Sequence, residues 1–79
     1  MIDNIATGLR LKEICEKQGI SADDIRNALH LSDTRSVYYW FSGRYLPSID
    51  NLCMLADLLQ TSVDDLLILK PKTSTVPRI

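Results

Sequence analysis

The chain has 79 residues and a formal charge of −1, from 9 Lys and Arg against 10 Asp and Glu, and 46% of its residues are hydrophobic. This length holds one small domain and excludes a second sensory or catalytic domain. The composition is typical of globular proteins and excludes a disordered or fibrous chain. The charge balance lacks the basic excess of an obvious nucleic-acid binder.

The sequence has no apolar run near the roughly 18 residues that a membrane span requires, and it lacks the segments of a secretory signal. We therefore expect a cytoplasmic protein with no membrane partner. Cys15 and Cys53 are expected to be small buried hydrophobic residues rather than a disulfide. One histidine and no Cys-x-x-Cys pair predict no metal site, and no cofactor is expected.

The hydrophobic pattern predicts an all-α protein, because apolar residues recur every three or four positions without sustained alternation. The first predicted helix covers about residues 5–18, with Leu11, Ile14 and Cys15 on one side. Gly19 follows it and supplies the left-handed residue that commonly ends a helix.

A second helix is predicted to begin after Ser21, whose hydroxyl can accept from the amide of Asp24. Acidic residues at positions 23 and 24 suit the positive end of this helix. Its predicted inner face consists of Ile25, Ala28 and Leu29.

A third helix is predicted from a cap at Ser32 to about Phe41, with Gly43 ending it. Val37, Trp40 and Phe41 have the spacing of one apolar stripe. We assign Trp40 to the core because its stripe partners are apolar.

The fourth and fifth predicted helices follow Pro47, which forces its predecessor out of helical geometry. Ser48 is predicted to cap the fourth helix, whose inward residues are Ile49, Leu52, Leu55, Ala56 and Leu59. The fifth helix starts at Ser62 and carries Leu66, Leu67 and Leu69. Residues 70–79 have two prolines and three positive charges, which predicts a flexible basic tail after a domain at 5–69.

Ordered sequence blocks over most of the chain carry a family resemblance. These blocks are Gly8–Ile14 with Gly19–Ser21, Ile25 with Leu29–Ser32, Val37–Trp40 with Gly43, Leu46–Leu52 with Leu55–Ala56, and Val63–Leu67. In them the sequence resembles the Cro and phage-repressor type of helix-turn-helix domain, the XRE family, from about residue 8 to residue 68. The short link between the second and third helices, residues 30–32, fits a helix-turn-helix unit.

The resemblance implies a five-helix lambda-repressor-like bundle in which helices two and three form the helix-turn-helix. It further implies a transcription regulator that binds double-stranded DNA sequence-specifically, as a homodimer. The recognition helix, at about residues 33–42, would lie in the major groove.

The sequence departs from the family pattern at several positions. Ala22 stands where a phosphate-contacting Gln is frequent, Arg26 where a small residue is common, and His30 where the turn commonly holds Gly. One extra residue lies among positions 33–36. Whether Ala22, Arg26 and His30 weaken DNA binding stays open, and His30 is expected to be a partly exposed turn residue rather than a pH switch.

Arg10 matches an arginine that in many family members pairs with a glutamate, but Phe41 occupies the partner position here. Arg10 must therefore pair elsewhere, face solvent or reach a phosphate, and we favour solvent or a phosphate because an unpaired buried charge is expensive.

The candidate DNA-contacting residues lie on the predicted recognition helix and at its two ends. They are Ser32, Thr34, Arg35, Ser36, Tyr38, Tyr39, Ser42, Arg44 and Tyr45. Arg35 is favoured for base contact, because a guanidinium in the first turn can bind guanine O6 and N7. Its alternative role is a solvated side chain opposite Asp33 or another surface acid.

The remaining candidates divide between phosphate contacts and packing. Ser32 and Thr34 suit phosphate at one end of the helix, and Ser42, Arg44 and Tyr45 suit it at the other. Tyr38 and Tyr39 can contact thymine methyls or phosphate, or can pack on the core or in a dimer, and at least one is expected to be structural.

The charges are distributed unevenly along the chain. Residues 26–48 carry three arginines against Asp33, a balance of +2, whereas residues 49–69 carry four aspartates and no Lys or Arg, a balance of −4. Residues 1–25 contribute −2 and residues 70–79 contribute +3. A regional basic face is therefore compatible with an acidic chain, although few cations predict weak non-specific DNA binding for each subunit.

Two other classes of function compete with a DNA-binding regulator. One is a helix-turn-helix scaffold turned to protein binding, as an antitoxin or adaptor, with weak or no DNA binding. The other is an enzyme, which we do not expect, because the sequence shows no nucleophile arrangement and no glycine-rich phosphate loop. No small-molecule substrate is expected. The operator sequence, the regulated genes and the dimer interface are not readable from the sequence.

Overall fold

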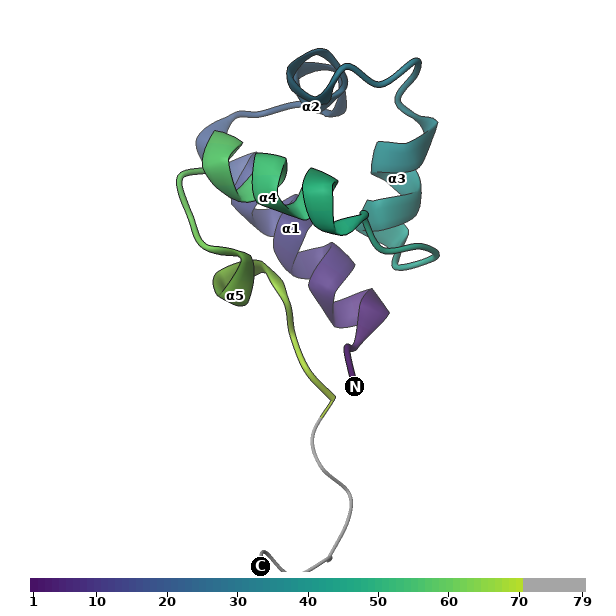
Figure 1. Cartoon of the computed structure of the whole chain (residues 1–79), viewed down its shortest axis with the longest axis vertical. Helices are drawn as coiled ribbons and strands as arrows, with labels where there is room; N and C mark the ends of the chain where they lie inside the picture. Colours follow the sequence, from purple (N-terminus) through teal and green to yellow (C-terminus); the bar gives the residue numbers. More distant parts are fainter. Residues whose placement is uncertain (71–79) are drawn as a thin grey trace, which may run out of the picture.

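The computed structural model describes residues 1–70; residues 71–79, which hold most of the predicted tail, lie outside the described part. The described residues form an all-helical bundle (Figure 1). Its helices are α1 (Asn4–Gln18), α2 (Ala22–Leu29), α3 (Arg35–Ser42), α4 (Ile49–Leu58) and α5 (Val63–Leu66). None of these helices is long and apolar enough to cross a membrane. The predicted fold class is therefore confirmed.

Most helix ends are formed by the residues that the sequence indicates. The hydroxyls of Ser21, Ser48 and Ser62 accept from backbone amides in the first turns of α2, α4 and α5. At Ser21 the bonding is reciprocal, because the Asp24 carboxylate accepts from the Ser21 amide at 2.9 Å. Gly19 ends α1 in the left-handed region, with φ of 70°. Three of the four predicted serine caps are thus confirmed.

The predicted start of the third helix is wrong. The helix α3 begins at Arg35 after Thr34, which makes no side-chain cap bond, and Ser32 is an exposed residue outside the helix. Asp33 instead accepts from the Arg35 amide at 2.8 Å. An aspartate that bonds the amide two residues on favours a turn over a helix, so the helix begins two residues later than a cap at Ser32 would place it.

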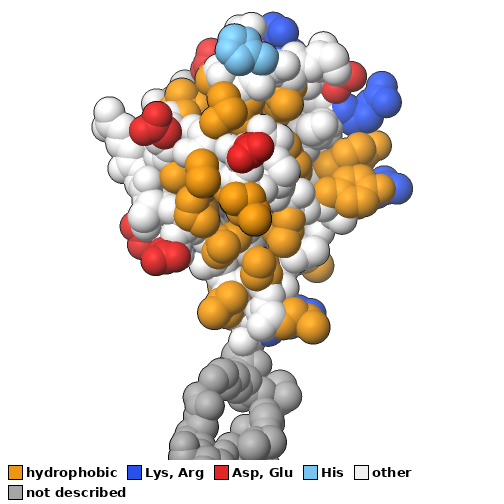
Figure 2. Space-filling view, in the orientation of Figure 1, with side chains coloured by type: hydrophobic (Ala, Val, Ile, Leu, Met, Phe, Trp, Pro, Cys, Tyr) orange, Lys and Arg blue, Asp and Glu red, His pale blue; other side chains and the backbone are white. Residues whose placement is uncertain are grey.

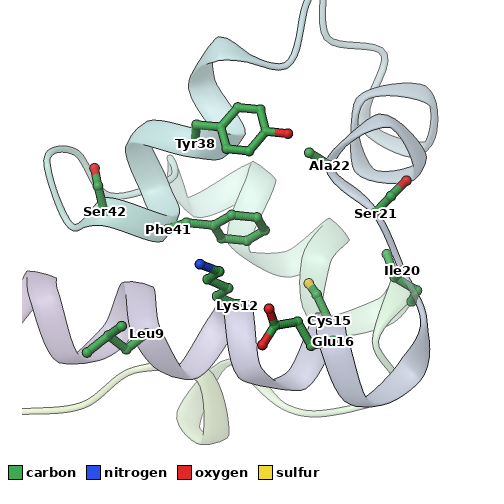
Figure 3. Close-up of a pocket in the computed structure, with 10 residues that line it drawn as sticks. All are labelled: Leu9, Lys12, Cys15, Glu16, Ile20, Ser21, Ala22, Tyr38, Phe41 and Ser42. Carbon is green, nitrogen blue, oxygen red and sulfur yellow. The ribbon is translucent and has the colours of Figure 1, made fainter.

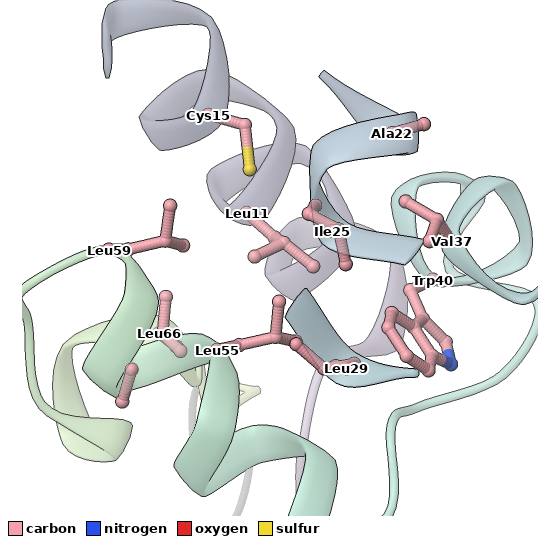
Figure 4. Packing of buried hydrophobic residues seen from close by; sticks show 11 residues of the cluster. Leu11, Cys15, Ala22, Ile25, Leu29, Val37, Trp40, Leu55, Leu59 and Leu66 are labelled. Carbon is pink, nitrogen blue, oxygen red and sulfur yellow. The ribbon is translucent and has the colours of Figure 1, made fainter. Parts of the chain in front are cut away.

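The hydrophobic core lies between α1, α2 and α4, with α3 and α5 closing its two sides (Figure 4). Its fully buried side chains are Cys15, Ile25, Val37, Leu55, Leu59 and Leu66. Trp40 is 5% exposed, which confirms its assignment to the core, whereas Phe41 is only partly buried against it. A Cβ added to Gly8 would lie 2.3 Å from the Trp40 carbonyl oxygen, so α1 and α3 meet backbone to backbone.

Two residues predicted to be buried, Ile49 and Cys53, are exposed, and Leu69 lies beyond the fifth helix that was predicted to carry it. Ile49 is 78% exposed because it is the first residue of α4, before that helix turns its apolar face to the core. Leu69 is 64% exposed because α5 ends at Leu66 and the chain continues extended. Cys53 lies on the outer face of α4, whereas Cys15 is buried as predicted, and both thiols are free.

Residues near the end of the described chain are tied to α1 and to the segment before it. Leu69 forms an antiparallel bridge with Ile2, and Lys70 donates its amide to the Met1 carbonyl at 2.8 Å. The buried Thr7 hydroxyl accepts from the Ile68 amide at 2.9 Å. These bonds fix residues 68–70 beside the start of α1.

Of the three alternatives for Arg10, the structure shows pairing with another partner rather than the favoured solvent or phosphate. Arg10 donates from Nε to the backbone carbonyl of Asp65, across the contact between α1 and α5. A carbonyl at the last turn of a short helix has no intrahelical partner, so it can take this donor. Arg10 therefore helps to hold α5 in place.

Candidate nucleic-acid interface

The first candidate residues surround the N-terminal end of α3. Arg35 and Ser32 are exposed, and Thr34 and Ser36 are half-buried. The other role predicted for Arg35 is a solvated side chain opposite Asp33 or another surface acid. Within residues 1–70, however, the ion pair found is between Arg26 and Asp23, and the bond from Asp33 goes to the Arg35 backbone. The Arg35 guanidinium is therefore available on the surface.

The second group lies at the C-terminal end of α3. The Arg44 guanidinium carbon stands 5.1 Å from the ring centre of Tyr39 and 5.8 Å from that of Tyr45. The two rings meet edge to face, with centres 5.3 Å apart. Such contacts hold a guanidinium over the rings by cation–π attraction while leaving its outer N–H groups free.

Backbone geometry keeps this second group close to α3. Gly43 ends the helix with φ of 80°, which reverses the chain toward Arg44. The Ser42 hydroxyl donates to the Tyr39 carbonyl at 3.0 Å and accepts from the Arg44 amide at 3.4 Å. Tyr39, Ser42, Arg44 and Tyr45 thus form one cluster, which we call the α3-end cluster.

Tyr38 points to a different side of α3 from this cluster. Its ring packs edge to face on Phe41, with centres 6.2 Å apart, and it is 58% exposed. Both rings border an open groove of about 520 Å³ between α1, the start of α2 and α3 (Figure 3). The walls are mostly apolar, and Lys12 and Glu16 of α1 stand at the groove as well.

Cys15 lies at the inner side of the same groove but is only 1% exposed. Burial, with a smaller effect from the charge of Glu16, raises the pKa of its thiol to about 11. The thiol therefore stays protonated and unreactive at neutral pH, as expected of a packing residue.

The link between α2 and α3 accepts the two large residues that depart from the family pattern. His30 ends α2 in the left-handed region, with φ of 58°, and its amide reaches the Asn27 carbonyl. It is exposed, as expected of a turn residue. Arg26 donates to the Asp23 carboxylate at 2.8 Å, which raises the pKa of the guanidinium. The turn therefore forms without glycine, at the modest cost of one strained residue.

Charged side chains separate across the molecule. In the view of Figure 2 Lys and Arg side chains lie at the top, along the edge that carries α3 and at the lower end, whereas acidic side chains lie mainly over the centre and the opposite side, with one also at the α3 edge. This matches the balances of +2 for residues 26–48 and −4 for residues 49–69. The surface beside α3 is therefore the less acidic one.

One further cation lies near the interface and was not among the predicted residues. Lys70 borders a shallow depression together with Ile5 and Gly43, directly before Arg44 of the α3-end cluster. The sequence around Lys70 does not indicate that Lys70 lies near Gly43, because this location depends on the pairing of residues 2 and 69.

Comparisons with known proteins agree with this geometry. A helix-turn-helix family model matches residues 11–66, which is most of the chain. Among curated proteins, no sequence matches.

Two solved structures share the arrangement of helices. The restriction-modification controller protein C.AhdI from Aeromonas hydrophila has a TM-score of 0.73 and 26% identity, covering 81% of this chain and 96% of that chain. The DNA-binding domain of BldD has a TM-score of 0.68 and 23% identity, covering 82% of this chain and 93% of that chain, which shows a common fold. The chain therefore belongs to the XRE-type helix-turn-helix family of DNA-binding regulators.

Proposed function

We propose that the protein binds double-stranded DNA sequence-specifically, with α3 in the major groove, and regulates transcription. The observation that carries this proposal is the outer face of α3. Val37 and Trp40 bury the inner face of this helix, and Arg35 projects from its first turn without an acidic partner among residues 1–70. The first turn is the part of a recognition helix that approaches base edges.

Arg35 is the residue that reads a base in this proposal. Its guanidinium can donate two hydrogen bonds to O6 and N7 of a guanine, a pattern that no other base pair offers in the major groove. Ser36 and Tyr38 flank it on α3 and contact neighbouring bases or sugars, and Ser32 and Thr34 donate hydroxyls to the phosphates before the helix.

The α3-end cluster supplies the backbone contacts. Arg44 reaches a phosphate, and Tyr39 and Tyr45 hold its guanidinium in place by the contacts of 5.1 and 5.8 Å. The Tyr45 hydroxyl adds a neutral donor, and Ser42, whose hydroxyl donates to the Tyr39 carbonyl, lies beside it at the end of α3. Tyr39, which the sequence left open between DNA contact and packing, therefore serves as a positioning residue for Arg44.

A homodimer completes the proposal. The three arginines of residues 26–48 are few for tight DNA binding by one subunit, and Arg26 is already paired with Asp23. Two subunits double the phosphate contacts and read two half-sites one helical turn apart.

The test is a titration of the full chain against a random DNA library at two salt concentrations, with Arg35→Ala beside the wild type. We expect the wild type to enrich a sequence and Arg35→Ala to lose about 1–3 kcal/mol of discrimination at one position of it. Lys17→Ala, which removes the same charge from the end of α1, is the matched control and should keep the discrimination. Binding that is indifferent to sequence in both proteins would refute the proposal.

A protein partner is the second candidate function, and the groove of about 520 Å³ beside α3 favours it. Exposed apolar residues Leu9 and Tyr38 border this groove. Under this alternative a stable protein partner co-purifies with the chain without nucleic acid, and Leu9→Ser releases it. Enrichment of a DNA sequence by the isolated chain would decide for the first proposal.

A further inference from the structure

We infer that two copies of this chain associate through the groove beside α3, with their α1 helices antiparallel across a two-fold axis. The inference rests on the proposed function, because it supplies an interface for the homodimer that reads two half-sites. It commits to a second copy of this chain as the occupant of the groove. The support comes from the apolar residues at the two ends of the groove, from two charges between them, and from the acidic character of α4.

The first observation is an exposed apolar side chain at one end of the groove and open apolar space at the other. Leu9 is 59% exposed, whereas Ile20 is half-buried and Ala22 is buried. Figure 3 shows Leu9 and Ile20 at opposite ends of the groove. The surface beside Ile20 is open, since a Cβ built on Gly19 would meet no other part of residues 1–70 within 4 Å. One end therefore offers a side chain and the other end offers room for one.

A two-fold axis makes these two ends complementary. In a contact of this symmetry, residue i of one copy touches residue j of the other, and j touches i. Leu9 and Gly19 each lie five residues from Ile14. An antiparallel pair of α1 helices that cross near Ile14 therefore brings Leu9 of each copy to Gly19 and Ile20 of the other. Both ends are then covered, and the contact closes as a dimer.

The second observation is a pair of opposite charges between the two apolar ends. Lys12 and Glu16 line the groove from α1, and both are exposed. Neither is paired within the subunit, since the ion pair found among residues 1–70 is that of Arg26 with Asp23.

The same antiparallel crossing satisfies these charges. Lys12 and Glu16 each lie two residues from Ile14, so Lys12 of one copy stands opposite Glu16 of the other, and the pair occurs twice. A parallel crossing would instead set lysine against lysine and glutamate against glutamate, which is repulsive. The charges therefore select the antiparallel orientation.

The charges set the orientation of the two copies more than their affinity. An exposed ion pair contributes little to stability, whereas like charges that face each other cost considerably more. The contact is also short, because α1 extends only about 14 Å from Leu9 to Gln18. We therefore expect a dimer that dissociates on dilution.

The third observation is that the apolar residues exposed on α4 do not suit a second copy. Ile49 and Met54 are exposed on this helix. Residues 49–69, however, carry four aspartates and no Lys or Arg, so two copies that met through α4 would bring like charges together. The groove-facing side of α1 has one charge of each sign and avoids this repulsion.

The contact through the groove leaves the two proposed DNA-binding arginines free. The groove is lined from α3 by Tyr38, Phe41 and Ser42. Arg35 and Arg44 are not among its lining residues. Tyr38 and Ser42 belong to both surfaces, so their variants would not separate self-association from DNA binding. Lys12 and Glu16 on α1 do separate the two.

The experiment reverses the two charges one at a time and then mixes the products. Lys12→Glu leaves two acidic residues at the groove, and Glu16→Lys leaves two lysines. Sedimentation equilibrium of the full chain without DNA measures the dimer dissociation constant of each variant, of the double variant and of an equimolar mixture of the two single variants. Asp57→Lys, which makes the charge change of Glu16→Lys on α4, is the matched control. Circular dichroism checks that every variant remains helical.

We expect each single reversal to weaken the dimer about tenfold or more, because like charges then face each other across the axis. The double variant regains the lost affinity, and so does the mixture, as a heterodimer of the two single variants. Mixing does not restore a variant that fails to fold, so this recovery separates charge pairing from damage to the structure. Asp57→Lys keeps the wild-type dissociation constant.

Several results would overturn the inference. They are a wild type that stays monomeric and so leaves the groove to a different protein, single reversals without effect, a mixture that does not regain the dimer, and a change in Asp57→Lys as large as in Glu16→Lys. Enrichment of a DNA sequence by the wild type tests base reading by α3 independently, because it does not depend on which surface joins the two copies.

Discussion

The helices α2 and α3 have the same length of eight residues but are stabilised in different ways. Hydrogen bonds at its own ends define α2, through the reciprocal pair of Ser21 and Asp24 and the ion pair of Asp23 with Arg26. In contrast, α3 has no side-chain cap at Thr34 and depends on burial of Val37 and Trp40. Both helices bury an inner face, with Ile25 and Leu29 in α2, but of the two only α2 also has a side-chain cap at its first turn.

This difference fits the roles proposed for the two helices. A helix that must present its ends and outer face to DNA cannot use those polar groups for internal capping. The helix α3 therefore relies on its inner face and on the close contact of its backbone with Gly8. This comparison is tested by substitutions that remove either a side-chain cap or a buried contact, but not both.

The largest effect is expected for Trp40→Ala. It removes a side chain that is 5% exposed and leaves a cavity between α3 and the core, so the free energy of unfolding should fall by about 3–5 kcal/mol. Urea denaturation followed by circular dichroism measures this loss. Tyr38→Ala on the exposed side of the same helix is the control, and an equal loss there would contradict the dependence on burial.

Gly8→Ala is expected to act on the same contact from the side of α1. Its new Cβ would meet the Trp40 and Phe41 carbonyl oxygens at 2.3 and 2.6 Å, so the backbones must separate. We expect a loss of about 1–3 kcal/mol, even though alanine favours helix more than glycine does. Thermal unfolding reports the loss, and Glu13→Ala on the exposed face of α1 should leave the melting temperature almost unchanged.

The two N-caps form a matched pair for a smaller effect. Ser21→Ala removes the bond to the Asp24 amide and should cost about 1 kcal/mol, whereas Thr34→Ala should cost clearly less because no cap bond is present. Both free energies come from the same urea titration. Equal losses would show that α3 is capped in solution and would break the comparison.

The smallest effect is a dependence on pH at the start of α2. Hydrogen bonds from the Ser21 backbone and side chain hold the pKa of Asp24 below its ordinary value. A lowered pKa stabilises the folded state above the unfolded pKa of about 4, and this contribution is lost as the pH falls through the lowered value. Unfolding measured between pH 6 and pH 3 should therefore show a shallower decline in Asp24→Asn than in the wild type.

The sequence predicts the locally determined features and misses those that depend on tertiary contact. Ser21, Ser48 and Ser62 are readable as caps because capping chemistry lies within four residues. Ser32 is also a serine before a predicted helix, but the Asp33 carboxylate accepts from the Arg35 amide, and α3 begins only at Arg35. Periodicity finds the buried Val37 and Trp40, and it fails at Ile49 and Leu69, which lie at or beyond helix ends.

The candidate site shows the same division. The positions of Arg35 and Arg44 at the two ends of α3 follow from the sequence pattern. The stacking of Arg44 on Tyr39 and Tyr45, and the partner of Arg10 on α5, depend on side-chain directions that spacing does not give. Lys70 lies near Gly43 at the end of α3 because of a backbone pairing between residues 2 and 69, which no pattern of neighbouring residues indicates.

The contacts between α1 and the segment after α5 also set the order in which the domain can be completed. The buried Thr7 hydroxyl bonds the Ile68 backbone, 61 residues later, and Arg10 bonds the Asp65 carbonyl, 55 residues later. While the chain is being synthesised, α1 exists long before these partners leave the ribosome. Contacts between residues so far apart in the sequence slow folding. The polar groups of α1 therefore gain these hydrogen bonds only after the last residues of the domain have been synthesised.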